Sequence, residues 1–163
     1  MPAPPMIGNL KLNLQLATQA DALEIARMSR DLIEQGLGWS WTPRRVLHSV
    51  VDPQTNVVVA LKVSNLLGFG IMKYHEEEAH LLLLAVHPAV ARRGVGSTLL
   101  AWLEKAAITA GVGQVYLEVR ASNAAARAFY RRAGYAEIQH LPGYYQGQEP
   151  AVRLAKDLWL SQA

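Results

Sequence analysis

The chain has 163 residues, a length that suits one domain with its own hydrophobic core and is short for two. Hydrophobic residues make up 51% and charged residues 18%, an ordinary globular composition that excludes a disordered chain. The absence of cysteine excludes disulfides, a thiolate metal site and a cysteine nucleophile. Lys and Arg number 16 against 13 Asp and Glu, a balance that suits a small phosphorylated ligand and does not indicate a nucleic-acid surface.

The amino end reads "MPAPPMIGN" and lacks both the basic and the long apolar segment of a signal peptide. No apolar run in the chain approaches the roughly 18 residues that a membrane span needs. We therefore expect a cytoplasmic protein without a membrane or nucleic-acid partner, in which residues 1–8 are flexible.

Residue spacing predicts the elements of the first half. Leucine alternates with polar residues over residues 10–16, which predicts a strand. Apolar residues at helical spacing after Thr18 predict a helix that ends at Gly36, and the order Thr42, Pro43 marks the start of a second, shorter helix. The polar sequence "HEEEAH" (residues 75–80) is interpreted as a turn within an antiparallel meander of three strands, at residues 55–63, 65–75 and 80–88.

The second half alternates strands and helices. An apolar stripe that includes Leu99, Leu103 and Ala110 predicts a long helix that stops at Gly111. A strand, a helix and two further strands are predicted after it, at residues 113–120, 123–134, 135–140 and 149–158. No internal repeat or low-complexity linker divides the chain. The sequence therefore predicts a single α/β domain with a mixed sheet over residues 1–163.

The sequence "AVHPAVARRGVGSTLL" (residues 85–100) leads from a strand through a glycine-rich loop into the long helix. The first turn of a helix leaves backbone N–H groups unpaired, and Gly94 and Gly96 let an anion approach them. Arg92 and Arg93 can pair with phosphate oxygens. The spacing fits neither a Walker loop nor a full dinucleotide fingerprint. The loop is a candidate phosphate site, with an ordinary strand-to-helix turn as the alternative.

Three polar residues lie at the end of the next strand and in the helix that follows. Alternation in "QVYLEVR" places Glu118 on the face opposite the apolar residues, as a candidate catalytic carboxylate or as a solvated or ion-paired glutamate. Asn123 can cap the helix or bond a ligand amide. Tyr130 lies two turns further along the same helix face, as a candidate site residue or as a core tyrosine with a satisfied hydroxyl.

Together these residues resemble the GCN5-related N-acetyltransferase (GNAT) superfamily. The sequence "YLEVRASNAAARAFYRRAGY" is similar to the RimI type, the bacterial ribosomal-protein alanine N-acetyltransferases, and this likeness is sharp over residues 85–148. The resemblance implies the α/β GNAT fold, with a mixed, mostly antiparallel central sheet of six to seven strands and about four flanking helices.

The resemblance also implies acetyl-CoA as cosubstrate, Glu118 as general base and Tyr130 as general acid. It assigns cofactor binding to Leu84, Ala85, Val86, Arg92, Arg93, Gly94, Val95, Gly96, Ser97, Asn123 and Tyr130. Two residues depart from the family pattern. Ala91 stands where Arg or Gln is usual, which puts one phosphate contact in doubt, and Pro150 stands where the RimI type has an acidic residue, which puts the peptide specificity in doubt.

The acceptor is expected to be a primary amine. An α-amine with a pKa near 7.7–8.0 costs about 3 kcal/mol less to deprotonate at neutral pH than a lysine near 10.4, which favours a protein N-terminus. A small-molecule amine is the alternative, and a non-catalytic acyl-CoA-binding scaffold or sensor is a third hypothesis. The choice depends on the first two helices, Trp39, Trp41 and the hairpin at residues 143–152. A homodimer is compatible with the sequence.

Two other chemistries are not indicated. The histidines of "HEEEAH" are five residues apart, whereas the zinc-binding HExxH pattern spaces them by about four, so we expect no metal site. Ser97 lies outside any G-x-S-x-G motif, so a serine hydrolase is not indicated.

Overall fold

Seven strands form the central sheet of the structure, a computed structural model that describes residues 6–7 and 10–160. Their order across the sheet is β3-β4-β5-β6-β7-β9-β8, and every neighbouring pair is antiparallel except β6 and β7. The strands are β3 (Asn13–Leu16), β4 (Thr55–Lys62), β5 (Asn65–Tyr74), β6 (Glu78–Val86), β7 (Gln114–Arg120), β8 (Ala136–Tyr145) and β9 (Glu149–Asp157). A separate two-stranded pair joins β1 (Met6–Ile7) and β2 (Leu10–Lys11).

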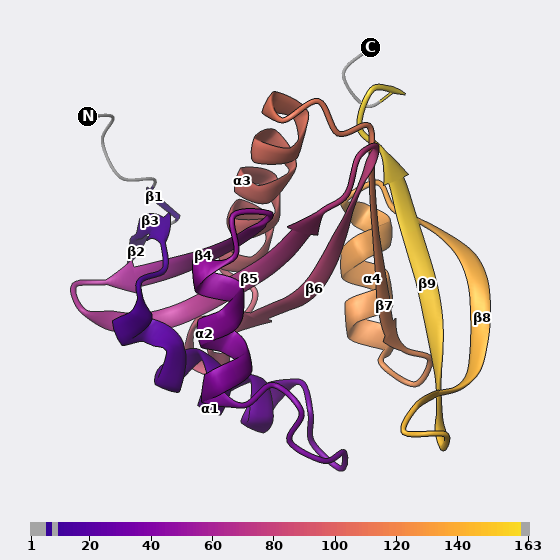
Figure 1. The fold of residues 1–163 in the computed structure, drawn as a ribbon, viewed down its shortest axis with the longest axis horizontal. Helices are drawn as coiled ribbons and strands as arrows, with labels where there is room; N and C mark the ends of the chain where they lie inside the picture. Colours follow the sequence, from indigo (N-terminus) through magenta and orange to yellow (C-terminus); the bar gives the residue numbers. More distant parts are fainter. Residues whose placement is uncertain (1–5, 8–9, 161–163) are drawn as a thin grey trace.

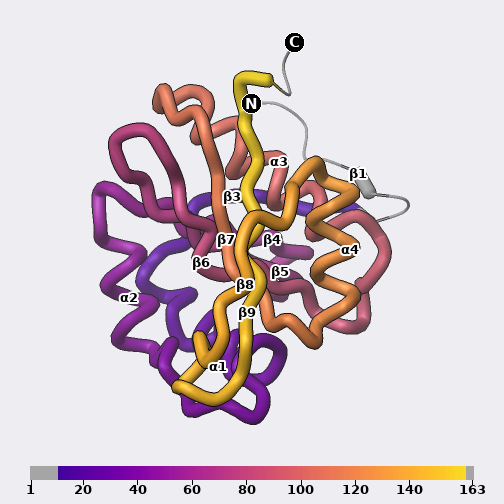
Figure 2. The backbone as a smooth tube through the Cα atoms, turned by 90° about the vertical axis from the view of Figure 1, so that its right-hand side faces the viewer, coloured from indigo at the N-terminus to yellow at the C-terminus, as the bar shows by residue number. Residues whose placement is uncertain are grey.

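Helices cover both faces of this sheet. They are α1 (Ala22–Leu32), α2 (Pro43–Val51), α3 (Val95–Thr109) and α4 (Ala124–Arg132), with short 3-10 turns at Gln19–Asp21 and Pro88–Val90. Figure 2 shows α2 on one side of the strands and α4 on the other. Val58 in β4 packs into the core cluster that contains Leu103 of α3, whereas its neighbour Val59 packs into the cluster that contains Ile25 of α1. Successive side chains of β4 therefore point to opposite faces of the sheet and pack into two separate hydrophobic cores.

The parallel pairing of β6 with β7 is short. It covers Glu78↔Gln114, Ala79↔Val115 and His80↔Tyr116, and beyond these pairs the two strands diverge (Figure 1). The pairing of β5 with β6 also shifts register, because Ile71 lies opposite Leu83 and Met72 opposite Leu81. Leu82 is thus the extra residue of a β-bulge, which bends the strand at the point where it leaves β7.

The order and type of the predicted elements are confirmed, and several boundaries differ, among them the end of the first helix, which lies at Leu32 and not at Gly36. The strand predicted over residues 10–16 is divided into β2 and β3. The turn predicted at residues 75–80 is shorter, because β6 already begins at Glu78. The strand predicted over residues 135–140 continues to Tyr145, so it extends into the hairpin expected at residues 143–152.

The expected flexibility of residues 1–8 falls mostly on residues outside the described part of the chain, since only Met6–Ile7 among them belong to it. Among the described residues, no helix combines the length and the apolar character that crossing a membrane requires.

Gly68 in β5 lets α3 pack closely against the sheet. A methyl group added at Gly68 would lie 2.9 Å from the carbonyl oxygen of Ala85 and 3.0 Å from a methyl carbon of Leu99. The first of these is a backbone atom of β6, so relief requires a shift of the strand itself. The glycine therefore helps to set the distance between α3 and β6.

We expect Gly68→Ala to lower the free energy of unfolding by about 1–3 kcal/mol, because overpacking against backbone forces the strand or the helix to move. Urea denaturation followed by circular dichroism measures this. Gly38→Ala is the matched control, because its new methyl group would meet only the flexible amide end of Gln146. A Gly68→Ala protein as stable as wild type would contradict the close packing.

Candidate functional site

A cleft opens where β6 and β7 diverge. It encloses a cavity of about 430 Å³, which we call the cleft cavity. Its walls come from β6, β7, α4 with the turn before it, and the end of β8, and include Leu84, Ala85, Val86, Ala91, Glu118, Asn123, Ala126, Tyr130 and Tyr145. Because β6 has no neighbouring strand on its β7 side here, backbone N–H and C=O groups along that free edge are available to a bound ligand.

A second cavity, of about 310 Å³, lies between the loop that joins α1 to α2 and the β8–β9 hairpin. We call it the loop cavity. Its lining includes Glu34, Ser40, Trp41, Arg45, His80, Tyr144 and Gln146. The two cavities share the lining residues Ile33, Leu82, Leu83, Glu118 and Tyr145. Glu118 therefore lies at the boundary between two adjoining spaces.

The Glu118 carboxylate is held by three side chains. His80 Nε2 lies 2.6 Å from its Oε1, the Tyr144 hydroxyl donates to the same oxygen at 3.1 Å, and Arg153 Nε donates to Oε2 at 2.7 Å. Only 5% of the Glu118 side chain is exposed. Burial by itself raises the pKa of this carboxyl, but the hydrogen bonds from His80 and Arg153 outweigh burial and hold the pKa below its ordinary value.

Tyr130 lines the cleft cavity with an unpaired hydroxyl. The side chain is 7% exposed, and its ring packs edge-on against Phe129 and Tyr135. Within the described residues, no hydrogen bond to this hydroxyl is present, and no fully buried side-chain polar atom lacks a partner. The oxygen must therefore retain access to the cavity. Burial raises the pKa of Tyr130 far above its ordinary value, so the hydroxyl stays neutral and can donate a hydrogen bond to a ligand.

The glycine-rich loop begins at the edge of the cleft cavity, where Ala91 is part of the lining. Arg92 has φ 63° and Gly94 has φ 84°, so both adopt left-handed backbone conformations, which for arginine is uncommon and strained. Gly94 is the N-cap of α3 and supplies no capping side chain, which leaves N–H groups of the first turn to an anion. Arg92, Arg93, Gly94 and Ser97 are exposed, Gly96 is half-buried, and Val95 packs in the core.

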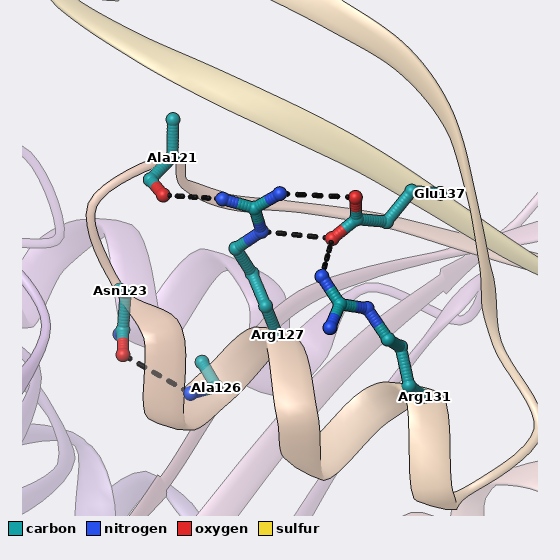
Figure 3. Close-up of polar contacts among 6 residues, drawn as sticks. All are labelled: Ala121, Asn123, Ala126, Arg127, Arg131 and Glu137. Carbon is teal, nitrogen blue, oxygen red and sulfur yellow. Dashed lines mark hydrogen bonds and ion pairs between the residues drawn. The ribbon is translucent and has the colours of Figure 1, made fainter.

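Asn123 caps α4, as one of the two interpretations of the sequence expects. Its Oδ1 accepts a hydrogen bond from the Ala126 amide at 3.1 Å (Figure 3). Arg127 donates to the carbonyl of Ala121 at 2.8 Å and pairs with Glu137 of β8, to which Arg131 also donates at 2.7 Å. These contacts fix the start of α4 and its preceding turn to the sheet. Cofactor binding by the Asn123 side-chain amide stays a prediction.

The comparisons with known proteins agree with this arrangement. The model of the Acetyltransferase (GNAT) family matches residues 24–135. The chain belongs to this family. A ribosomal protein bS18-alanine N-acetyltransferase of Salmonella typhimurium is 43% identical to this GNAT chain over 91 residues, which are 54% of the chain and 62% of that protein. The chain thus matches less than two thirds of the length of this curated relative.

Solved GNAT structures have the same fold. The ribosomal-protein-S18-alanine N-acetyltransferase of Escherichia coli superimposes with a TM-score of 0.75 at 28% identity, over 90% of this chain and 94% of that chain. The PaiA N-acetyltransferase of Thermoplasma acidophilum, solved in complex with coenzyme A, gives a TM-score of 0.77 at 22% identity, over 91% and 99%. The expected mixed, mostly antiparallel sheet of the GNAT fold is thereby confirmed.

The structure brings only part of the predicted cofactor set of this GNAT chain to one place. Five members line the cleft cavity, namely Leu84, Ala85, Val86, Asn123 and Tyr130. The residues of the glycine-rich loop, 92–97, lie beyond its lining, at the start of α3. Trp41 lines the loop cavity, whereas Trp39 lines neither cavity and donates from its indole nitrogen to the carbonyl of Ala26 at 3.2 Å.

Sequence reasoning missed four residues around Glu118 and the loop cavity: His80, Arg153, Tyr144 and Glu34. Arg153 reaches Glu118 because the two residues are paired across β7 and β9. His80 was interpreted as part of a polar turn. Glu34 is a buried carboxylate that accepts hydrogen bonds from Ser40 and Ser29, and it shapes the wall of the loop cavity. Within the described residues, no cluster of three or more His, Cys, Asp or Glu could hold a metal ion.

Substitution of Asn123 separates its two predicted roles. We expect Asn123→Ala to lower the free energy of unfolding by about 1 kcal/mol, whereas Asn123→Ser keeps the cap and most of the stability. Both variants lose the side-chain amide, so both are expected to bind acetyl-CoA more weakly in titration calorimetry. Unchanged acetyl-CoA affinity in Asn123→Ser would limit this residue to capping.

The lowered pKa of Glu118 predicts how stability depends on pH. A carboxyl with a lower pKa in the folded state stabilises the fold above its unfolded pKa of about 4.3, and this contribution is lost as the pH falls through the folded value. We expect Glu118→Gln to lower the free energy of unfolding by about 1.5–3 kcal/mol at pH 7, because hydrogen bonds to a charged group are lost. The difference from wild type should shrink toward pH 3.

Urea denaturation at several pH values measures this difference. Glu24→Gln is the control, because Glu24 is exposed and has no hydrogen-bond partner in the described part of the chain. A difference between wild type and Glu118→Gln that stays constant from pH 7 to pH 3 would show that the paired carboxylate does not stabilise the fold through its charge.

Proposed function

We propose that the chain transfers an acetyl group from acetyl-CoA to a primary amine, and that the acceptor is the N-terminal α-amine of a protein. The observation that carries the proposal is the junction of the two cavities at Glu118 and Tyr145. A thioester in the cleft cavity and an amine in the loop cavity would meet there. Membership of the GNAT family supports the reaction, and the names of the bS18-alanine N-acetyltransferase relatives support the acceptor.

The cleft cavity suits the donor. The start of α3 and the loop around Gly94 offer backbone N–H groups and the side chains of Arg92 and Arg93 to a pyrophosphate. The free edge of β6 at Leu84, Ala85 and Val86 offers backbone groups to the amides of a pantetheine arm. Binding along this line would hold the acetyl group beside Leu82 and Glu118 and so supply part of the rate by positioning.

The transfer step uses groups that the site already positions. The amine nitrogen bonds to the thioester carbonyl carbon, and the carbon–sulfur bond breaks. Backbone N–H groups of the free β6 edge would polarise the carbonyl oxygen. The departing thiolate takes a proton from Tyr130, whose hydroxyl is neutral and unpaired in the described structure. A base beside the amine takes the remaining proton. The carboxylate of Glu118 acts in this step, either directly or through a group that it binds.

The loop cavity suits an amine that is part of a larger molecule. Tyr144 and Tyr145 at the end of β8 and Trp41 of the α1–α2 loop give it aromatic walls. Burial and the neighbouring Glu118 carboxylate raise the pKa of Tyr144 to about 12, so its hydroxyl stays protonated and donates. An α-amine is easier to deprotonate than a lysine amine by about 3 kcal/mol at neutral pH, which suits a site without a strong base.

A small amine that also bears a carboxylate is the second candidate acceptor. The observation that favours it is Arg45, whose guanidinium lies 3.8 Å from the ring centroid of Trp41 and lines the loop cavity. Within the described residues, Arg45 forms no ion pair with a carboxylate. A carboxylate carried by the acceptor could pair with it.

Release of free CoA from acetyl-CoA tests the proposal, measured with short peptides of varied first residue and with a panel of small amines and amino acids. We expect turnover with peptides and a fall of about 100-fold in kcat for Tyr130→Phe, because proton donation to the leaving group is lost. Tyr74→Phe is the matched control, since Tyr74 bonds Asn56 in the sheet and lines neither cavity.

Each other outcome favours a different hypothesis. Turnover with carboxylate-bearing small amines alone would support the second candidate. Tight binding of acetyl-CoA without turnover on either panel would favour a non-catalytic acyl-CoA-binding protein.

A further inference from the structure

His80 is the last residue of β6 that pairs with β7, and the two strands begin to separate there. Its ring stacks on Tyr116 with centroids 4.2 Å apart and an interplanar angle of 17°. Its Nε2 contacts Glu118, and 20% of the side chain is exposed. His80 lines the loop cavity, the space that the proposed function assigns to the amine. The ring is therefore held by Tyr116 on one face and by Glu118 at Nε2, and it lies beside the loop cavity.

Glu118 itself is poorly placed to take a proton directly. Oε1 accepts from His80 and Tyr144, and Oε2 accepts from Arg153. Three of the roughly four lone-pair sites of the carboxylate are thus occupied, which leaves an amine at most one open site, on Oε2. The guanidinium of Arg153 also favours the ionised form, which opposes transfer of a proton to this carboxylate.

The contact with Glu118 determines the form of the imidazole. Because an ionised carboxylate only accepts hydrogen bonds, Nε2 of His80 must carry the proton in this 2.6 Å contact. In the neutral ring, Nδ1 then holds the lone pair, and it has no hydrogen-bond partner among the described residues. A histidine base that is oriented by a carboxylate through its other nitrogen is an arrangement that enzymes use repeatedly for proton transfer.

We propose that His80 is the general base of the reaction and that Glu118 is a positioning residue, which orients the imidazole through Nε2. This inference rests on the proposed acetyl transfer. Starting from the neutral amine, the nitrogen bonds to the carbonyl carbon, the carbon–sulfur bond breaks, and the amine proton passes to Nδ1 of His80. Tyr130 gives its proton to the thiolate, and exchange with solvent restores the neutral forms of both side chains.

Kinetics of three variants test this role, with the acceptor that the wild type uses best. His80→Ala removes the ring, and His80→Gln keeps an amide donor for Glu118 but cannot accept the proton. His75→Gln is the matched control, because His75 is an exposed histidine at the β5–β6 turn and lines neither cavity. The measurements are kcat, KM for the acceptor, acetyl-CoA affinity by calorimetry, and the effect of imidazole added to the assay.

We expect kcat to fall about 100-fold in both His80 variants, with acetyl-CoA affinity unchanged and His75→Gln as active as wild type. Added imidazole should restore part of the activity of His80→Ala and none of that of His80→Gln, because only the first leaves space for a free base. Such rescue depends on proton transfer and would not follow from a structural role.

Two results would overturn the role of His80 alone. One is wild-type kcat in His80→Gln, which would show that the hydrogen bond to Glu118 suffices. The other is a loss of activity in His80→Ala that added imidazole does not restore. If the wild type binds acetyl-CoA but turns over no acceptor, the proposed acetyl transfer fails, and the role of His80 fails with it.

Discussion

The early end of the β6–β7 pairing is the constraint on which the candidate site depends. A sheet normally satisfies the hydrogen bonds of its inner strands by pairing each strand along its whole length. Here the two strands part after three residue pairs, so polar backbone groups are left free inside the fold, where an unpaired group is costly. A long, amide-containing ligand can satisfy them. The bulge at Leu82 bends β6 where it leaves β7, and the loop before α3 continues from the end of this bent strand.

Contacts within each half of the sheet, and one that links the end of α1 to β7, hold the walls of the two cavities. Gly68 brings α3 close to the backbone of β6, on one side of the cleft. On the other side, Arg127 and Arg131 tie α4 to Glu137 of β8. At the end of β7, Arg120 bonds the carbonyl of Ile33 at 2.9 Å and pairs with Glu149 at 3.3 Å, which joins α1 to the β8–β9 hairpin. The walls of both cavities are thus held by non-covalent contacts between distant parts of the chain.

Local patterns predicted most of the elements, because alternation and helical spacing record which side of each element is buried. They also placed Glu118 on the polar face of its strand. The strand predicted over residues 135–140 stops short of the end of β8, whereas Tyr145 still pairs with Glu149 after an irregular stretch. The partners of Glu118 could not be predicted, since His80, Tyr144 and Arg153 come from three other strands. Their meeting depends on sheet order and register, which no local pattern contains.

The cleft cavity and the loop cavity adjoin at Glu118, where they share some lining residues, and are otherwise lined by different residues, which bears on the order of events in catalysis. Cofactor and acceptor would approach Glu118 through different walls, so neither has to leave before the other can bind. On the proposed function, both substrates can therefore be bound together, and initial-rate plots at several fixed acceptor concentrations should intersect, where a relay through an acetylated enzyme would give parallel lines.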